Sequence, residues 1–289
     1  MRSQRSRTVF AVWRWVAKTA LVLGALPAVQ LQTDTRFGLH ARRLCQQTLG
    51  AVLYLRGHWQ TSEAALVRSI KLARSFGGVF PEVLGSQRLA LLETAMGRYE
   101  DAHRRIRDTL PVARSSSHPM VRGHSPGRLL ATAIRNRYEA GDLGAATEYL
   151  AQSFAEQAMT GECATCDVML YPAAVPVYIA LGDLQQAERA SAKADETALL
   201  FRSRAWSASA SSCRGLLAAA RQQWQSASES LAAALQIFEA IEQPYDVART
   251  LETLADVADR SGSPAAEADA LRKRADDLHA RLGSRRVIR

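Results

Sequence analysis

The sequence predicts an all-α protein, a solenoid of about six helix-turn-helix repeats spaced roughly 40 residues apart. The first observation is an internal repeat at this period, which is typical of helical arrays. The second is composition, because hydrophobic residues make up 47% of the 289-residue chain and alanine, the best helix former, is abundant. The third is that no segment shows the alternating pattern between Asn-Gly or Asp-Gly turns that predicts strands.

Each repeat is marked by a turn between its two helices. The turn positions are Gly57, Gly97, Gly141, Gly182, Gln222 and Gly262, separated by 40 to 44 residues. Two residues beyond the turn, five of the six units carry a large apolar or aromatic side chain, which can wedge between two helices. The spacings therefore predict the same unit along most of the chain.

The helix after each turn carries a small, a bulky apolar and a second small residue, at five, nine and twelve positions beyond the turn. These offsets share one helical face, where small side chains let two helices cross closely. The small pairs are Ser62 and Ser69, Ala102 and Thr109, Ala146 and Ser153, Ala187 and Ala194, and Ala227 and Ala234. Ser191 replaces the bulky residue of unit four. Glu267 and Arg274 replace the small residues of unit six, which predicts a polar terminal cap.

The helix before each turn is less regular. Apolar residues lie eight and four positions before the turn in the better units. Glu93 and Arg137, however, fall where units two and three need a core residue. A register shift of one residue, to Leu92 and Tyr138, would place large uncharged side chains at these positions.

Proline, serine and glycine predict the helix starts and the loops. We expect four prolines in the first turn of a helix: Pro81, Pro126, Pro244 and Pro264. Ser125 and Ser263 are expected as N-caps. Pro176 is expected to kink the first helix of unit four or to delay its start. Residues 112–127 are predicted to form a long loop that accounts for the 44-residue spacing.

The repeat resembles the tetratricopeptide (TPR) family over about residues 41–280. The period is longer than is usual in that family, and it resembles the long-helix type in the C-terminal regions of LuxR-type ATP-dependent bacterial transcriptional regulators. Residues 233–250 and 278–283 look like the repeat junction and the closing segment of that group. The resemblance implies a right-handed superhelix and a role in protein–protein interaction or effector sensing.

In such a superhelix the first helices line a concave face, which is the usual ligand groove. By register, the predicted lining residues are Gln87, Arg88, Arg128, Arg135, Tyr138 and Arg249. Arginine side chains beside a tyrosine suit an acidic or extended peptide, or an anionic effector. The alternative is that these residues are merely exposed.

Basic charge gathers at the two ends of the chain. The formal net charge is +9, but residues 44–280 hold 25 basic and 27 acidic residues. We therefore expect no nucleic acid to bind the repeat body. Residues 281–289 are predicted to be a basic tail.

Residues 1–40 form a separate basic and apolar segment, predicted to be a helical cap or a signal or membrane anchor. Arg14 and Lys18 interrupt its apolar run, and residues 19–29 alone are too short to span a bilayer. Four cysteines are too few for a disulfide scaffold in a chain of this length. A cytoplasmic protein is predicted, with export or membrane anchoring through residues 1–31 as the alternative.

Candidate catalytic motifs are weak. Gly123-His124-Ser125-Pro126-Gly127 matches a nucleophile elbow, but no strand precedes it. Cys163 and Cys166 form a Cys-x-x-Cys pair with no histidine near in sequence; they are interpreted as small buried cysteines, with reversible oxidation or metal binding as alternatives. No phosphate-binding loop is present. The prediction is no enzyme, no cofactor and no metal.

The hypothesis that follows is a non-enzymatic protein–protein interaction scaffold that binds a protein or peptide partner in its concave groove. The alternative is a sensor or regulatory fragment of a bacterial transcriptional regulator whose ATPase and DNA-binding parts lie elsewhere. The sequence leaves the oligomeric state open.

Overall fold

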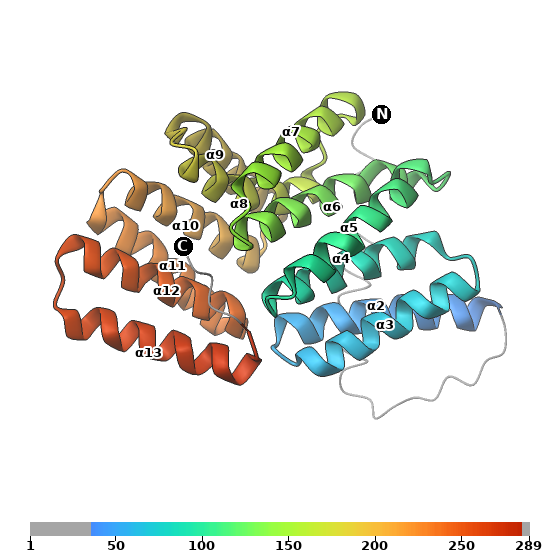
Figure 1. Ribbon diagram of the computed structural model, residues 1–289, viewed down its shortest axis with the longest axis horizontal. Helices are drawn as coiled ribbons and strands as arrows, with labels where there is room; N and C mark the ends of the chain where they lie inside the picture. The colour runs from blue at the N-terminus through green and yellow to red at the C-terminus, as the bar shows by residue number, and fades with distance from the viewer. Residues whose placement is uncertain (1–35, 285–289) are drawn as a thin grey trace.

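The structure, a computed structural model, describes residues 36–284, and within them the chain forms twelve α-helices and no β-strand (Figure 1). The helices are α2 (Arg36–Leu55), α3 (Trp59–Ser75), α4 (Val79–Ala95), α5 (Tyr99–Ser115), α6 (Pro119–Glu139), α7 (Leu143–Thr160), α8 (Ala164–Ala180), α9 (Leu184–Phe201), α10 (Arg204–Ala220), α11 (Trp224–Ala240), α12 (Pro244–Ser261) and α13 (Ala265–Leu282). They form six successive pairs, which confirms the predicted all-α solenoid.

Within the described residues the helices run from Arg36 to Leu282. The predictions for residues 1–31 lie outside the described residues. Over the part of the chain that is described, none of the helices combines the length and the apolar character needed to cross a bilayer.

The six predicted turns are those that separate the two helices of each pair. All six turn residues have a positive backbone φ, from 59° at Gln222 to 81° at Gly141, the left-handed conformation that commonly ends a helix. Asp142 and Asp183 follow two of these glycines, and each carboxylate caps the next helix by accepting a backbone N–H at 3.0 Å. The repeat spacing read from the sequence is therefore confirmed.

The small residues of the second helices are buried where each pair of helices crosses. The first small position is 0% exposed in units one to five, at Ser62, Ala102, Ala146, Ala187 and Ala227. The Ser62 hydroxyl also donates a hydrogen bond to the backbone oxygen of Gly50 at 2.6 Å. A close helix crossing thus explains why these positions hold small side chains.

The sixth unit keeps its small residues, so the prediction that polar residues replace them is wrong. Ala268 and Ala275 are 0% exposed, whereas Glu267 and Arg274 point to solvent. The register moves by one residue because Pro264 is the N-cap and α13 begins only at Ala265. In units one to five the second helix begins two residues after the turn.

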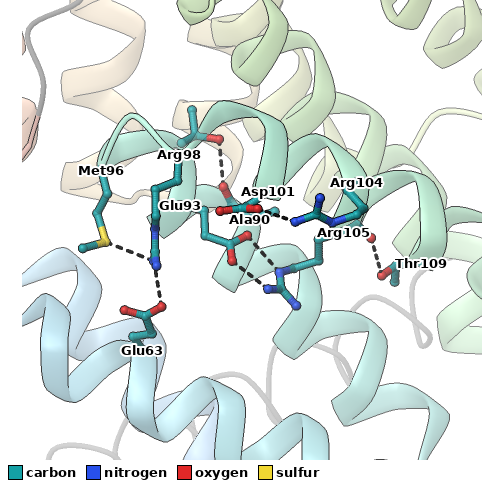
Figure 2. A network of polar contacts seen from close by, with 10 residues as sticks. Glu63, Ala90, Glu93, Met96, Arg98, Asp101, Arg104, Arg105 and Thr109 are labelled. Carbon is teal, nitrogen blue, oxygen red and sulfur yellow. Dashed lines mark hydrogen bonds and ion pairs between the residues drawn. The ribbon is translucent and has the colours of Figure 1, made fainter.

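Two charged residues occupy core positions of the first helices, and no register shift is needed to explain them. The Glu93 side chain is 4% exposed and accepts two hydrogen bonds from Arg105, at 2.9 and 2.6 Å. Figure 2 shows these two groups facing each other. Arg137, with a side chain 5% exposed, donates to Glu100 at 2.8 Å and to the Tyr99 carbonyl at 3.0 Å. Each buried charge is therefore paired with an opposite charge on α5, the neighbouring helix.

The predicted loop over residues 112–127 is wrong. Helix α5 continues to Ser115 and α6 begins at Pro119, so the 44-residue spacing reflects a longer helix of 21 residues. Ser125 and Pro126 lie inside α6 and are buried. They are therefore neither an N-cap nor a helix start, and the whole Gly-x-Ser-x-Gly segment is helical. Tertiary packing has overridden a local composition that is typical of loops.

The other prolines follow the predictions more closely. Pro244 is the first residue of α12, and Pro81 lies in the first turn of α4. Pro264 directly precedes α13 and is itself the N-cap, in place of Ser263. Pro176 lies inside α8 as expected, but the start of α8 at Ala164 is not delayed.

The first helices of the six pairs form one layer. Each of α2, α4, α6, α8, α10 and α12 contacts the next in this series, whereas the second helices make their main contacts with helices adjacent in sequence. We call these six first helices the inner layer. The layer curves until the last repeat meets the first, as the blue and red ends of the array show in Figure 1.

The contact between the two ends of the array is aromatic. The rings of Trp59, at the start of α3, and Tyr245, at the start of α12, pack edge to face with centroids 5.4 Å apart. Leu282 joins the same buried cluster. A Cβ on Gly57 would lie 2.7 Å from Leu282, so glycine permits the close approach. We call this contact between the first and last repeats the closure.

Candidate functional site

The six predicted groove residues all lie on the inner layer. Gln87 and Arg88 lie on α4; Arg128, Arg135 and Tyr138 lie on α6; and Arg249 lies on α12. The structure does not bring them together as one site. It divides the four arginines into two pairs with different surroundings.

Arg135 of the third repeat and Arg249 of the last meet beside the closure and share one acid. Arg135 donates to Glu139 at 2.8 Å, and Arg249 forms an ion pair with the same carboxylate. Both guanidinium groups also lie over the Tyr245 ring, at 5.6 and 5.9 Å from its centroid. The Tyr245 hydroxyl donates to Glu139 at 3.5 Å. This pair is therefore already occupied by partners within the chain.

Burial shapes the electrostatics of the closure. It raises the pKa of Tyr245 and of Asp246, and the nearby Arg135 guanidinium acts against both increases. Glu139 is 5% exposed, so its charge depends on the two arginines for compensation. The closure is thus a compact network in which opposite charges are matched.

Arg88 and Arg128 form the second pair, and within residues 36–284 neither has a carboxylate partner. The Nε atoms of both are enclosed without an acceptor. Arg128 uses one terminal nitrogen to donate to the backbone oxygen of Thr165 at 3.0 Å. Burial, followed by the nearby Arg128 guanidinium, lowers the pKa of Arg88 to about 9. Burial likewise lowers the pKa of Arg128, and the nearby Cys166 and Cys163 act against this decrease.

Gln87 and Tyr138 are held by packing. Gln87 is 1% exposed and donates to the Thr132 hydroxyl at 2.8 Å, while its side-chain oxygen has no hydrogen-bond partner among the described residues. It has almost no surface for a ligand to contact in this conformation. Tyr138 is half-buried and packs against the core cluster that includes Ile134 and Ala174. Ligand contact by the six residues remains a prediction.

The unpaired arginines give this part of the inner layer a distinct chemical capacity. A guanidinium carries five N–H donors and binds carboxylate or phosphate groups with two parallel hydrogen bonds. A desolvated charge without a counter-charge is costly. Arg88 and Arg128 both keep part of their side-chain surface exposed. The pair can therefore accept an external anion, which would offset this cost.

Two clefts lie elsewhere on the described part of the molecule. One, of about 810 Å³, follows the seam of the closure between the turn at Arg56 and His58 and helices α12 and α13. The other, of about 330 Å³, is lined by acids and arginines of α3, α4 and α5, including the network in Figure 2. Both are lined by charges of both signs and contain none of the predicted groove residues.

Sequence reasoning missed the residues that decide how the arginines differ. Glu139 lies four residues after Arg135, a helical spacing that allows an ion pair, so a local signal existed. Tyr245 lies 106 residues from Glu139, and no local pattern predicts their contact.

No protein-family profile matches the chain, and no curated protein shows significant sequence similarity to it. Similar solved structures do exist. A Rap protein complexed with Competence and Sporulation Factor is 13% identical, with a TM-score of 0.66, and the match covers 86% of this chain and 66% of that one. The Rap conjugation gene regulator of plasmid pLS20, in complex with the Phr* peptide, is 14% identical, with a TM-score of 0.66 and coverage of 93% and 68%.

The fold is a TPR-like α-solenoid. BtubC (BKLC) from P. vanneervenii also matches, with 20% identity, a TM-score of 0.51 and coverage of 80% of this chain and 94% of that one. The solenoid spans about two thirds of the length of the two Rap chains. Identities this low show the shared fold alone.

Proposed function

We propose that this solenoid is a non-enzymatic scaffold that binds a peptide carrying acidic groups on its inner layer, with Arg88 and Arg128 holding a carboxylate. The two Rap structures are complexes, one of them with the Phr* peptide, and they share this fold. The repeated helical layer offers an extended surface of the kind that binds peptides in solenoids.

The observation that carries the proposal is the missing counter-charge at Arg88 and Arg128. Other half-buried arginines of the described chain, such as Arg105 and Arg135, have a glutamate within 3 Å. An acid supplied by a partner would complete the same arrangement at the α4–α6 surface. Charge-assisted hydrogen bonds of this kind contribute more than neutral ones do.

The test is peptide binding by fluorescence anisotropy at low and at physiological salt. A labelled set of short peptides would include acidic sequences, the same sequences with Asp and Glu changed to Asn and Gln, and versions with amidated C-termini. We expect the acidic peptides to bind more tightly, because only they supply a carboxylate to the arginine pair. Amidation distinguishes a terminal carboxylate from a side-chain one.

Three variants sharpen the test. Arg88→Gln and Arg128→Gln should each weaken binding by about 10- to 100-fold, since a hydrogen bond to a charged group contributes about 1.5–3 kcal/mol. The matched control is Arg68→Gln, an exposed arginine on the second helix α3. Equal affinity of all three variants for the acidic peptide would refute the assignment of the pair, and so would equal binding of acidic and neutral peptides.

The alternative of a regulatory fragment of a transcriptional regulator rests on the resemblance of residues 233–250 and 278–283 alone. No contact within residues 36–284 favours it over peptide binding. A cytoplasmic location and the absence of nucleic-acid binding by the repeat body also stay predictions from the sequence.

A further inference from the structure

Three side chains with soft or borderline metal-ligand atoms meet between the third and fourth repeats. The Nδ1 atom of His124 lies 2.9 Å from the Sγ atom of Cys163, and the two sulfur atoms of Cys163 and Cys166 are 3.0 Å apart. One ligand atom from each of the three lies within 4.8 Å of the other two. The sequence separates His124 from the cysteines by about 40 residues, so its spacing gave no sign of this cluster.

The local structure explains why the three residues meet. Cys163 is the N-cap of α8, and Cys166 lies in the first turn of that helix, on the same face. His124 lies near the start of α6, in the segment that lengthens this helix to 21 residues. Gly127 follows one turn later, and a Cβ there would lie 3.5 Å from the Cys166 sulfur. That distance is an ordinary van der Waals contact, so α6 and α8 pack directly against each other at this point.

Surrounding hydrogen bonds orient the two cysteine side chains. The Cys166 thiol donates to the backbone oxygen of His124 at 3.2 Å, and the Thr165 hydroxyl lies 3.1 Å from the Cys163 sulfur. Arg128 holds the same turn through the Thr165 carbonyl. Partners that fix the orientation of ligating groups are typical of metal sites.

We propose that His124, Cys163 and Cys166 bind a zinc ion between α6 and α8. Zinc takes cysteine sulfur at about 2.3 Å and histidine nitrogen at about 2.0–2.1 Å in tetrahedral geometry, which sets the sulfur atoms about 3.7 Å apart. The Cys163 sulfur lies 3.0 Å from the Cys166 sulfur and 2.9 Å from the His124 Nδ1 atom, so both separations reach tetrahedral spacing when these atoms move apart by less than about 1 Å, within the range of a side-chain rotation. Two thiolates and a neutral imidazole balance the charge of the ion.

Within the described residues the cluster supplies three ligands, so the fourth position is left for water or an exogenous ligand. The ion would join the third repeat to the fourth. Because repeats of a solenoid contact mainly their neighbours, a metal bridge at one junction fixes the relative orientation of the two flanking repeats. This proposal does not depend on the peptide-binding proposal.

A disulfide is the competing use of the two cysteines. Forming it joins the two sulfur atoms, releases two protons and passes two electrons to an oxidant such as a protein disulfide. That reaction does not require His124, whereas zinc binding does. Dependence on His124 therefore separates the two uses.

The experiment uses the full-length chain without an affinity tag, reduced with a phosphine and stripped of metal with a chelator. Zinc is then titrated in competition with a chromophoric chelator, and cobalt(II) is added in a parallel sample. We expect one zinc per chain, a higher melting temperature with zinc, and a thiolate-to-cobalt charge-transfer band. Binding of less than one equivalent, or a cobalt spectrum without the thiolate band, would overturn the proposal.

Variants locate the site. Cys163→Ser, Cys166→Ser and His124→Gln should each weaken zinc binding by at least about tenfold, with circular dichroism to check folding. The matched controls are Cys213→Ser, a buried cysteine on α10, and His103→Gln, a histidine on α5 bonded to Tyr149, and both should bind zinc as the unchanged chain does. If Cys166→Ser fails to fold, the partly exposed His124 and Cys163 still decide the question. Unchanged affinity in His124→Gln, or equal loss in the controls, would exclude the site.

Discussion

The two arginine pairs of the inner layer occupy similar positions and have opposite surroundings. Arg135 and Arg249 converge on Glu139 and lie over Tyr245, so they join the third repeat to the last, beside the closure. No carboxylate of the described chain pairs with Arg88 or Arg128, and the Nε atom of each lacks a hydrogen-bond acceptor. The comparison teaches that an arginine on a predicted groove face indicates a ligand only when the fold does not already supply its counter-charge.

The same comparison separates stability from binding. At the closure, partners within the chain compensate the charges, so removing one partner leaves a desolvated charge behind. At the α4–α6 surface, no carboxylate of the described chain pairs with the arginines, so removing the Arg88 charge should cost little or even stabilise the fold. The predictions below compare the two regions, from the largest expected effect to the smallest.

Trp59→Ala should lower the free energy of unfolding by about 3–5 kcal/mol, because a large buried aromatic residue leaves a cavity. Trp59 is 3% exposed and packs on Tyr245 across the closure. Urea denaturation gives the loss, and small-angle X-ray scattering should show a larger radius of gyration as the ends separate. Trp224→Ala is the matched control, because Trp224 holds the same repeat position in unit five but is only half-buried. Equal losses and unchanged radii in the two variants would mean that the closure does not depend on Trp59.

Glu139→Gln should destabilise the fold by about 2–3 kcal/mol, since it removes the carboxylate that Arg135 and Arg249 share. The two arginine side chains are 27% and 20% exposed, so solvent screening keeps the loss below that of a fully buried pair. Chemical denaturation measures it. Glu188→Gln, which removes the exposed partner of Arg221, should leave the midpoint unchanged. A comparable shift in both variants would contradict the importance of the closure.

Arg88→Met should stabilise the free protein by about 1 kcal/mol, because it removes a desolvated charge without a partner and keeps a similar side-chain volume. Arg135→Met should destabilise it, because Glu139 loses one of its two arginine partners. The two melting curves are measured in the absence of peptide. A loss of stability in Arg88→Met would show that an acid of this chain pairs with it after all.

Added anions should stabilise the unchanged chain by less than about 1 kcal/mol more than they stabilise Arg88→Met, through weak binding at the arginine pair. Melting temperatures are compared in sodium sulfate and sodium chloride at equal ionic strength. The variant removes the general effect of sulfate on protein hydration from the comparison. Identical sulfate responses would mean that the pair does not accept an anion.

Prediction from the sequence succeeded where structure is set by local, repeated patterns. Each of the first five repeats has a turn, such as those at Gly57 and Gln222, and a small residue, such as Ala102, at a fixed number of positions after its turn. This spacing is a property of a single helix pair, so it can be recognised locally. Prediction failed at residues 112–127, where loop-like composition was overridden because Ser125 and Pro126 are buried in tertiary contacts. It also failed by one residue in the last repeat, because Pro264 delays the start of α13.

The sequence by itself determined the class, the number of repeats and the helical face that the second helices of the first five repeats bury, because these depend on periodicity within about 40 residues. Only the tertiary structure decided which charges are paired and which side chains meet. Tyr245 reaches Glu139 across 106 residues, and His124 reaches Cys163 across 39. Such contacts depend on the accumulated curvature of the array and on the length of α6. No local pattern records either quantity, because both arise from the packing of successive repeats on one another.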